Sequence, residues 1–316
     1  MKHRNIAIDL AKWLFAFLVV TLHTSFWHSY LLAPIARCAV PFFYMVTGYF
    51  VLNTSRENIL KTSKKWLVMW IKYSLILLAI GCLWNWCSGN HVTWSCRDTI
   101  DLVISGSNSF IDEHVYNGDT YGFSTLWFLY AGFLALMLYY IIYRQLYKKG
   151  VDVIMVILLS GSVITNYLFK IQYDESLRLV FLAIPFMYIG GRFRHIRFKK
   201  YNAKLFLIIV FLLWIIGLFE IDYVKTNKVV VQNIYLACIP LSLIVFYVIA
   251  NSSLTVGNKI MRYFPVSSTL DVYIWHRLVY FILVLLGCYI GVVGSIEVFL
   301  VTASLSIIIK QIRNEK

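Results

Sequence analysis

Charged side chains are scarce in this chain. Only 14% of its 316 residues are Asp, Glu, Lys or Arg, and 60% are hydrophobic, whereas a typical soluble domain is about 25% charged and about half apolar. The apolar residues recur along the whole sequence instead of forming one anchor, and the mean hydropathy is +0.73. The shortage of charge excludes a soluble globular protein and predicts an all-α polytopic membrane protein.

Several functional signatures are also missing. No nucleic-acid motif accompanies the net charge of +14, so we expect no nucleic-acid partner. No small-residue cleavage site follows the first apolar run, which argues against a cleaved signal peptide. There is no internal repeat and no appended soluble domain, so we expect a single membrane domain over 1–316. No metal site is expected, because metal-ligand spacing is absent among the six cysteines, Cys38, Cys82, Cys87, Cys96, Cys238 and Cys288.

Ten apolar segments approach or reach the length of about 20 residues that crosses a bilayer. They are approximately 6–27, 33–52, 66–86, 123–143, 151–169, 177–191, 203–220, 229–250, 266–288 and 293–309. With the N-terminus in the cytoplasm, 19 of the 29 Lys and Arg residues lie on the inner segments and five on the outer ones. This asymmetry predicts ten transmembrane helices in the cell membrane with both termini cytoplasmic.

Two polar segments between the spans have more than one interpretation. The long loop at about 87–122 is predicted to be extracytoplasmic and carries five acidic residues against one arginine. It is either an acceptor-binding lid or a solvated acidic loop, and its Cys87 and Cys96 could pair there. The basic stretch 191–200 either helps to hold an anionic cofactor at the inner surface or serves only topology and lipid headgroups.

Charged residues within the first span suggest a functional site, because a charge buried in a bilayer is costly. Asp9 and Lys12 are three residues apart and can pair on one helix face. Lys12 and His23 are eleven residues apart, so they share a face and lie about 16 Å apart along the axis. The stripe suggests a lined cavity. The structural alternatives are anchoring of Asp9 and Lys12 at the headgroups and a helix–helix hydrogen bond by His23.

The second and ninth spans supply further candidates. Arg37 lies about one turn inside the outer end of the second span, at a depth that His23 could share, and Pro41 is expected to kink this helix. Alternatively, Arg37 is an interfacial residue. In the ninth span, His276 either shares the cavity of His23 or makes a structural hydrogen bond, and Asp271 lies nearer the inner end. Trp127 is either an aromatic-belt residue or a contact near the outer loop.

The N-terminal motifs resemble those of the bacterial acyltransferase-3 family of integral membrane acyltransferases. The family pattern has an Arg or Lys, ten intervening residues and then a His on the first helix, followed by an Arg and a VPxFFxxSG-like second helix. The matching elements here are Asp9, Lys12, His23, Arg37, 40–43 (VPFF) and 47–49 (TGY). Lys12 stands for the commoner Arg and Thr47 for the usual Ser. The segments TLWFLYA (125–131) and YIWH (273–276) are also similar.

The resemblance implies transfer of an acyl group, commonly acetyl, from cytoplasmic acyl-CoA to a hydroxyl of an extracytoplasmic or lipid-linked glycan. His23 would act as general base or briefly carry the acyl group. Arg37 would stabilise the oxyanion or bind the acceptor. Lys12 would contact the anionic donor, oriented by Asp9, while His276, Asp271 and Trp127 are candidate cavity or acceptor contacts. The implied partners are the glycan and the bilayer.

A second resemblance competes with the first. The stretches 23–25 (HTS) and 37–50 (RCAVPFFYMVTGYF) are also similar to the membrane half of the serine transporter–racemases linked to vancomycin resistance. Those proteins add a large cytoplasmic racemase domain, and this sequence ends at Lys316 soon after its last predicted span. We therefore expect an enzyme, with a stand-alone carrier of a serine-like small molecule as the alternative. A non-catalytic helper in polysaccharide modification or export is a third possibility.

Overall fold

The computed structural model contains helices and no strands among the residues that it describes. The described residues are 5–24, 29–87, 126–148, 150–167, 182–196, 203–226, 235–252, 268–289, 291 and 293–314. The chain divides into two compact units. The first unit comprises Met1–Phe43, Phe198–Lys228 and Asn233–Lys316, and the second comprises Tyr44–Arg197 and Val229–Gln232.

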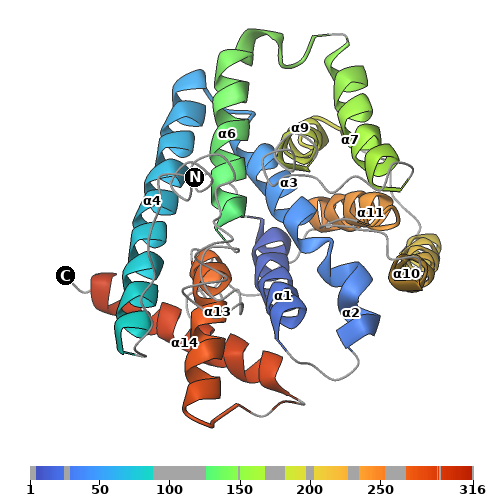
Figure 1. The fold of residues 1–316 in the computed structure, drawn as a ribbon. Helices are drawn as coiled ribbons and strands as arrows, with labels where there is room; N and C mark the ends of the chain where they lie inside the picture. The colour runs from blue at the N-terminus through green and yellow to red at the C-terminus, as the bar shows by residue number, and fades with distance from the viewer. Residues whose placement is uncertain are drawn as a thin grey trace. The chain divides into compact units, whose positions relative to one another are not determined.

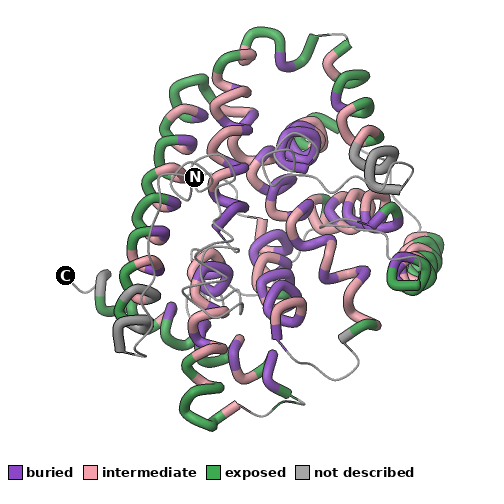
Figure 2. Tube along the Cα trace, in the orientation of Figure 1, coloured by how far each residue is buried: buried purple, intermediate pink, exposed green. Residues whose placement is uncertain are grey.

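The first unit is organised around its N-terminal helix (Figure 1). Helix α1 contacts α2, α11, α13 and α14, and α10 packs on α2 and α11. The bounds are α1 Ile6–His23, α2 Ser29–Ala36, α10 Ala203–Thr226, α11 Cys238–Asn251, α13 Ser268–Leu285 and α14 Gly294–Asn314. Burial differs sharply between these helices, since α1 is largely buried whereas α10 is mostly exposed (Figure 2). The exposed apolar face of α10 suits contact with lipid.

Small side chains hold α1 against α13 and α14. Their common core contains only Ala and Val among its buried members: Ala16, Val20, Val272, Val279, Val298 and Ala303. Small residues let helix backbones approach closely, which is how helices associate in a membrane, where burying apolar surface brings no gain over lipid. The first unit therefore packs as a membrane protein does.

The second unit contains α4 (Arg56–Cys87), α6 (Trp127–Ile141), the short 3₁₀ helix η3 (Tyr143–Gln145), α7 (Val151–Tyr167) and α9 (Ile184–Phe193). It also takes most of α3 (Ala39–Val51), whose first five residues belong to the first unit. Two glycines set the crossing of α3 and α9. A Cβ at Gly48 would overlap the carbonyl of Met187, and a Cβ at Gly190 would overlap that of Met45.

This crossing makes a stability prediction. Gly48→Ala should lower the apparent Tm in detergent, because the added methyl meets backbone atoms that cannot rotate away. Overpacking of this kind destabilises by about 1–3 kcal/mol, sometimes more. Thermal unfolding followed by Trp fluorescence measures the change. Gly291→Ala is the matched control, since an added Cβ there meets nothing within 4 Å. Equal Tm values for the two variants would contradict this account of the crossing.

The predicted spans correspond to helices, but not all of them qualify as spans on length and composition. Each of the ten predicted segments overlaps a helix in the described part of the chain. Five helical stretches are long and apolar enough to cross a membrane, namely Ile6–His23, Tyr30–Val51, Lys204–Thr226, Ser268–Leu285 and Gly294–Ile312. Three more are apolar but shorter: Trp127–Ile141, Val151–Gly161 and Cys238–Asn251. The chain is thus a multi-pass membrane protein, and the count of ten spans stays a prediction.

Three hydrogen bonds join ends of helices whose side of the bilayer is predicted from the sequence, and the topology itself stays a prediction. In the first unit, two ends predicted to be cytoplasmic meet where Asn5 Nδ2 donates to the carbonyl of Ala250 at 2.9 Å. Two ends predicted to be extracytoplasmic meet where the hydroxyls of Thr24 and Ser295 lie 2.7 Å apart. In the second unit, a third contact joins two predicted cytoplasmic connections, from Asn53 Nδ2 to the carbonyl of Gly191 at 3.0 Å. Within each unit, therefore, ends assigned to one side of the bilayer lie together.

Two of the sequence-based questions fall on residues that the structure does not describe. The proposed outer loop at 87–122 lies outside the described residues except for Cys87. The pairing of Cys87 with Cys96 therefore stays a prediction. Of the basic stretch 191–200, only 191–196 is described.

Candidate functional site

The second predicted span is broken at Arg37. Helix α2 ends at Ala36 and α3 begins at Ala39. The physical cause is Pro41, which has no N–H to bond the carbonyl four residues earlier, that of Arg37, and whose ring clashes with that carbonyl in a continuous helix. The sequence predicted a kink from this proline. The structure shows a turn of two residues, Arg37 and Cys38, between the two helices, so the Arg37 side chain lies at an irregular point within a predicted span.

Two thiols compensate for the break. The amide of Cys38 turns to the carbonyl of Ile35 at 3.0 Å instead of that of Pro34. The carbonyl of Pro34 instead accepts from the buried thiols of Cys38 at 3.3 Å and Cys238 at 3.2 Å. A carbonyl left unpaired in an apolar interior is costly, so these thiols stabilise the interruption. Both cysteines are free and buried, in line with their predicted role as small interior residues.

Arg37 keeps a donor available at this break. Its guanidinium lies over the ring of Tyr235, with Cζ 5.7 Å from the ring centroid. Its Nε is buried and has no hydrogen-bond partner among the described residues. Arginine cannot lose its charge in a protein, and an unsatisfied buried N–H is rare. Such a donor is suited to an oxygen atom of a bound molecule.

His23, the last residue of α1, bonds to α13. The Nη2 group of Arg277 lies 2.7 Å from Nδ1 of His23. A guanidinium can only donate, so Nδ1 must be the acceptor and a neutral imidazole then carries its proton on Nε2. Both sequence-based roles of His23, general base and acyl carrier, need a ring lone pair. In this arrangement the lone pair of His23 is occupied by Arg277.

His276 has the opposite tautomer. Its Nδ1 lies 2.8 Å from the carbonyl oxygen of Tyr273 and 3.1 Å from that of Val272, one turn earlier on α13. Carbonyl oxygens only accept, so Nδ1 carries the proton and Nε2 keeps the lone pair. His276 is fully buried, and its Nε2 has no partner in the described part of the structure.

The structure brings the two imidazoles together. The ring centroids of His23 and His276 are 5.2 Å apart, and the ring planes are inclined by 35°. One ring presents an N–H and the other presents a lone pair, while the guanidinium of Arg277 adds fixed positive charge. A base, a donor and a cation in an apolar interior are the groups required for proton transfer and for stabilising a developing oxyanion.

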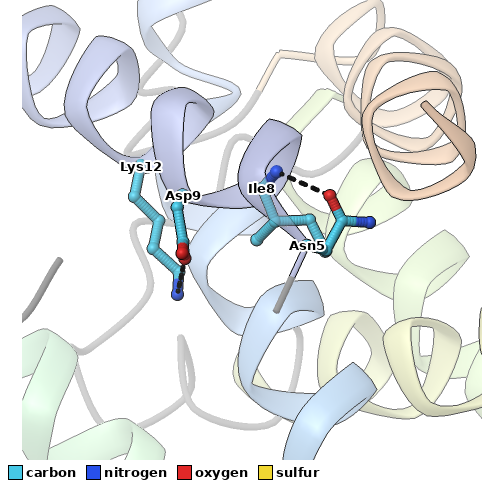
Figure 3. A network of polar contacts seen from close by, with 4 residues as sticks. All are labelled: Asn5, Ile8, Asp9 and Lys12. Carbon is cyan, nitrogen blue, oxygen red and sulfur yellow. Dashed lines mark hydrogen bonds and ion pairs between the residues drawn. The ribbon is translucent and has the colours of Figure 1, made fainter. Parts of the chain in front are cut away.

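The predicted pair at the start of α1 is confirmed. Lys12 Nζ lies 3.5 Å from Oδ1 of Asp9, and Asp9 is buried (Figure 3). The side-chain oxygen of Asn5 caps the helix by accepting from the amide of Ile8 at 3.2 Å. Asp9 lies in the first turn, where a carboxylate also interacts favourably with the helix dipole. Lys12 is eleven residues before His23, about 16 Å along the helix axis.

Asp271 and Trp127 were the other two candidate cavity contacts. Asp271 forms an ion pair with Lys310 of α14 at 3.2 Å, and the same ammonium donates to Ser268 Oγ at 3.1 Å. This contact joins the start of α13 to the end of α14. Trp127 begins α6 in the second unit and is only 7% exposed, so it does not face lipid as an aromatic-belt residue would.

The contribution of Arg277 is absent from the sequence-based site. Sequence reasoning missed Arg277 because its contact with His23 joins residues 254 positions apart. One signal could have identified it: a second charge beside a histidine in a predicted span is costly unless it has a partner.

Comparison with known proteins gives one family match and one related protein. Residues 5–311 match the family described as an acyltransferase domain. The chain is also 27% identical over 338 residues to an amino-acid racemase of Enterococcus faecalis, which agrees with the second resemblance. That alignment covers 99% of this chain and 46% of the relative, so the chain spans about half the relative's length. No solved structure matches.

The family match extends far beyond the N-terminal motifs. It begins at the cap of α1 and ends within α14, so it includes the helices that carry both histidines, the break at Arg37 and the Asp9–Lys12 pair. The chain belongs to the acyltransferase-3 family of membrane acyltransferases.

Proposed function

We propose that this protein transfers an acyl group, acetyl in the simplest case, from cytoplasmic acyl-CoA to a hydroxyl of an extracytoplasmic or lipid-linked glycan. The observation that carries the proposal is the pair of imidazoles with opposite tautomers on α1 and α13. Acyl transfer to a hydroxyl needs a base for the hydroxyl proton and a donor for the carbonyl oxygen. The pair, together with Arg277 and Arg37, offers both.

The predicted site residues are proposed to have different roles. Lys12 is proposed to contact the anionic donor at the cytoplasmic end, held by Asp9. His23 and Arg37 are proposed as catalytic residues, with Arg37 Nε directed to the oxyanion or the acceptor. Asp271 already has Lys310 as its partner, so its proposed role is to hold the start of α13. Trp127 is proposed to contact the acceptor.

Inside-out membrane vesicles test this function. They expose the cytoplasmic face, so radiolabelled acetyl-CoA is added outside and label is counted in the extracted envelope glycans. We expect label in the glycan fraction only when the chain is present. Vesicles from the same cells without the chain are the control. Equal labelling of the two preparations would contradict the proposal.

The alternative is a carrier of a serine-like molecule. It is favoured by the likeness to an amino-acid racemase from Enterococcus faecalis, together with the resemblance to the membrane part of serine transporter–racemases. In a carrier, the lone pair of His276 and the arginine-bound His23 would have a role only if they bound the transported molecule. The acyltransferase proposal accounts for both groups chemically.

Lys12 provides a prediction about donor binding. Lys12→Met should raise the apparent KM for acetyl-CoA about 10- to 100-fold, because a hydrogen bond involving a charged group contributes about 1.5–3 kcal/mol. The kcat should change little. Lys12→Arg is the matched variant and should keep most of the affinity. Initial rates across acetyl-CoA concentrations in the vesicles measure both constants, and an unchanged KM in Lys12→Met would remove Lys12 from the donor site.

A further inference from the structure

The contacts of the two histidines distinguish their chemical roles. Nδ1 of His23 accepts from Arg277 at 2.7 Å, so the nitrogen available to a substrate is the protonated Nε2. Nδ1 of His276 donates to the carbonyls of Tyr273 and Val272, so the available nitrogen is the unprotonated Nε2. Each assignment follows from a partner that can act in one way only, since a guanidinium cannot accept and a carbonyl cannot donate.

We propose that His276 is the general base of the acyl transfer, that His23 is the hydrogen-bond donor to the reacting carbonyl, and that Arg277 is the positioning residue that fixes the tautomer of His23. This assignment rests on the proposed function for its chemistry. It replaces the base or acyl-carrier role predicted for His23, and it assigns the role of base to His276, for which only a cavity contact was predicted.

The reaction balances with these roles. The acceptor hydroxyl loses its proton to Nε2 of His276 as its oxygen attacks the thioester carbon. The oxyanion of the tetrahedral intermediate accepts from Nε2–H of His23, whose tautomer Arg277 holds through Nδ1. The C–S bond then breaks, and the proton on His276 passes to the departing CoA sulfur. The products are the ester and CoA thiol, and both histidines return to their starting forms.

The contacts around the two histidines favour His276 as the base and His23 as the donor. His276 is fully buried, and its own helix backbone holds Nδ1–H, so the ring cannot exchange tautomers without losing two contacts. A base whose second nitrogen is held by a carbonyl has its orientation fixed, as in other histidine-based sites. His23 would have to displace Arg277 from Nδ1 before that nitrogen could accept a proton. The centroid separation of 5.2 Å places both rings beside one substrate group.

Nitrogen-15 NMR of the full chain tests the assignment without relying on turnover. Histidine-labelled protein in lipid bilayers at neutral pH distinguishes ring nitrogens that carry a proton from those that do not. The seven histidines are sorted by the signals that disappear in His23→Gln and His276→Gln. We expect the Nε2–H form for His23 and the Nδ1–H form for His276. Arg277→Met should release His23 into a mixture of tautomers, while Arg277→Lys, which still donates, should keep the Nε2–H form.

Transfer of radiolabelled acetyl from acetyl-CoA gives the second readout. A glutamine amide can donate from the position of Nε2 but cannot take up a proton. His23→Gln should therefore retain more activity than His23→Ala, whereas His276→Gln should be as inactive as His276→Ala. An active His276→Gln or reversed tautomers with intact acetyl transfer would overturn this assignment alone. The expected tautomers with no acetyl transfer by the unmodified chain would overturn the proposed function and the chemical use of the pair with it.

Discussion

His23→Ala is expected to lower acetyl transfer by about 100- to 1,000-fold, the usual loss when one donor to an oxyanion is removed. The reason is geometric. His23 ends α1, is held at Nδ1 by Arg277 and lies beside His276, so alanine removes the Nε2 donor and leaves the guanidinium of Arg277 without this partner. Label counted in envelope glycans of inside-out vesicles measures the loss.

A control on the same helix separates chemistry from folding. Leu14 faces outward on α1 with 57% exposure, so Leu14→Ala shortens a side chain without touching the histidine pair. This variant should keep transfer and expression close to those of the unmodified chain. If His23→Ala transferred acetyl as well as Leu14→Ala does, the histidine pair could not be the reacting centre.

Arg37→Met is expected to lower kcat by about 100-fold or more with little change in the KM for acetyl-CoA. The buried Nε of Arg37 has no partner among the described residues, so its proposed partner is an oxygen that gains charge during the reaction. An interaction made only in the transition state affects kcat and kcat/KM together. Arg37→Lys should recover little, because lysine cannot place a donor where Nε lies.

Comparing Arg37→Met with Lys12→Met separates an effect on kcat from an effect on KM. Steady-state rates in the same vesicles should show kcat effects for Arg37 and KM effects for Lys12. A variant of Arg37 that raised KM and left kcat unchanged would assign Arg37 to substrate binding. Variants of Lys12 and Arg37 therefore test whether donor binding and chemistry depend on different residues of the first two spans.

Local spacing predicted part of this site correctly. The Asp9–Lys12 pair follows from two residues three apart on one helix, where neighbours are fixed by the helix itself. The irregularity of the second span also followed from Pro41, and the structure places a two-residue turn between α2 and α3 at this point. The positions of the apolar segments also followed from composition, since each one overlaps a helix.

Helix ends and long-range partners were beyond sequence reasoning. The third predicted span was 66–86, whereas α4 runs over Arg56–Cys87, because its polar first turns continue the helix beyond the apolar stretch that the prediction recognised. The partners of His23 and Asp271 are Arg277 and Lys310, on other helices. No periodicity within one helix specifies such contacts, which depend on how helices pack in the first unit.

The most direct measurement compares two activities of one preparation. Inside-out vesicles containing the chain are given radiolabelled acetyl-CoA in one aliquot and radiolabelled serine in the other. We expect acetyl label in the glycan fraction, lost in His23→Ala, and serine accumulation no higher than in vesicles without the chain. Serine accumulation that requires the chain, with no acetyl label in the glycans, would contradict the proposed acyl transfer and establish the carrier instead.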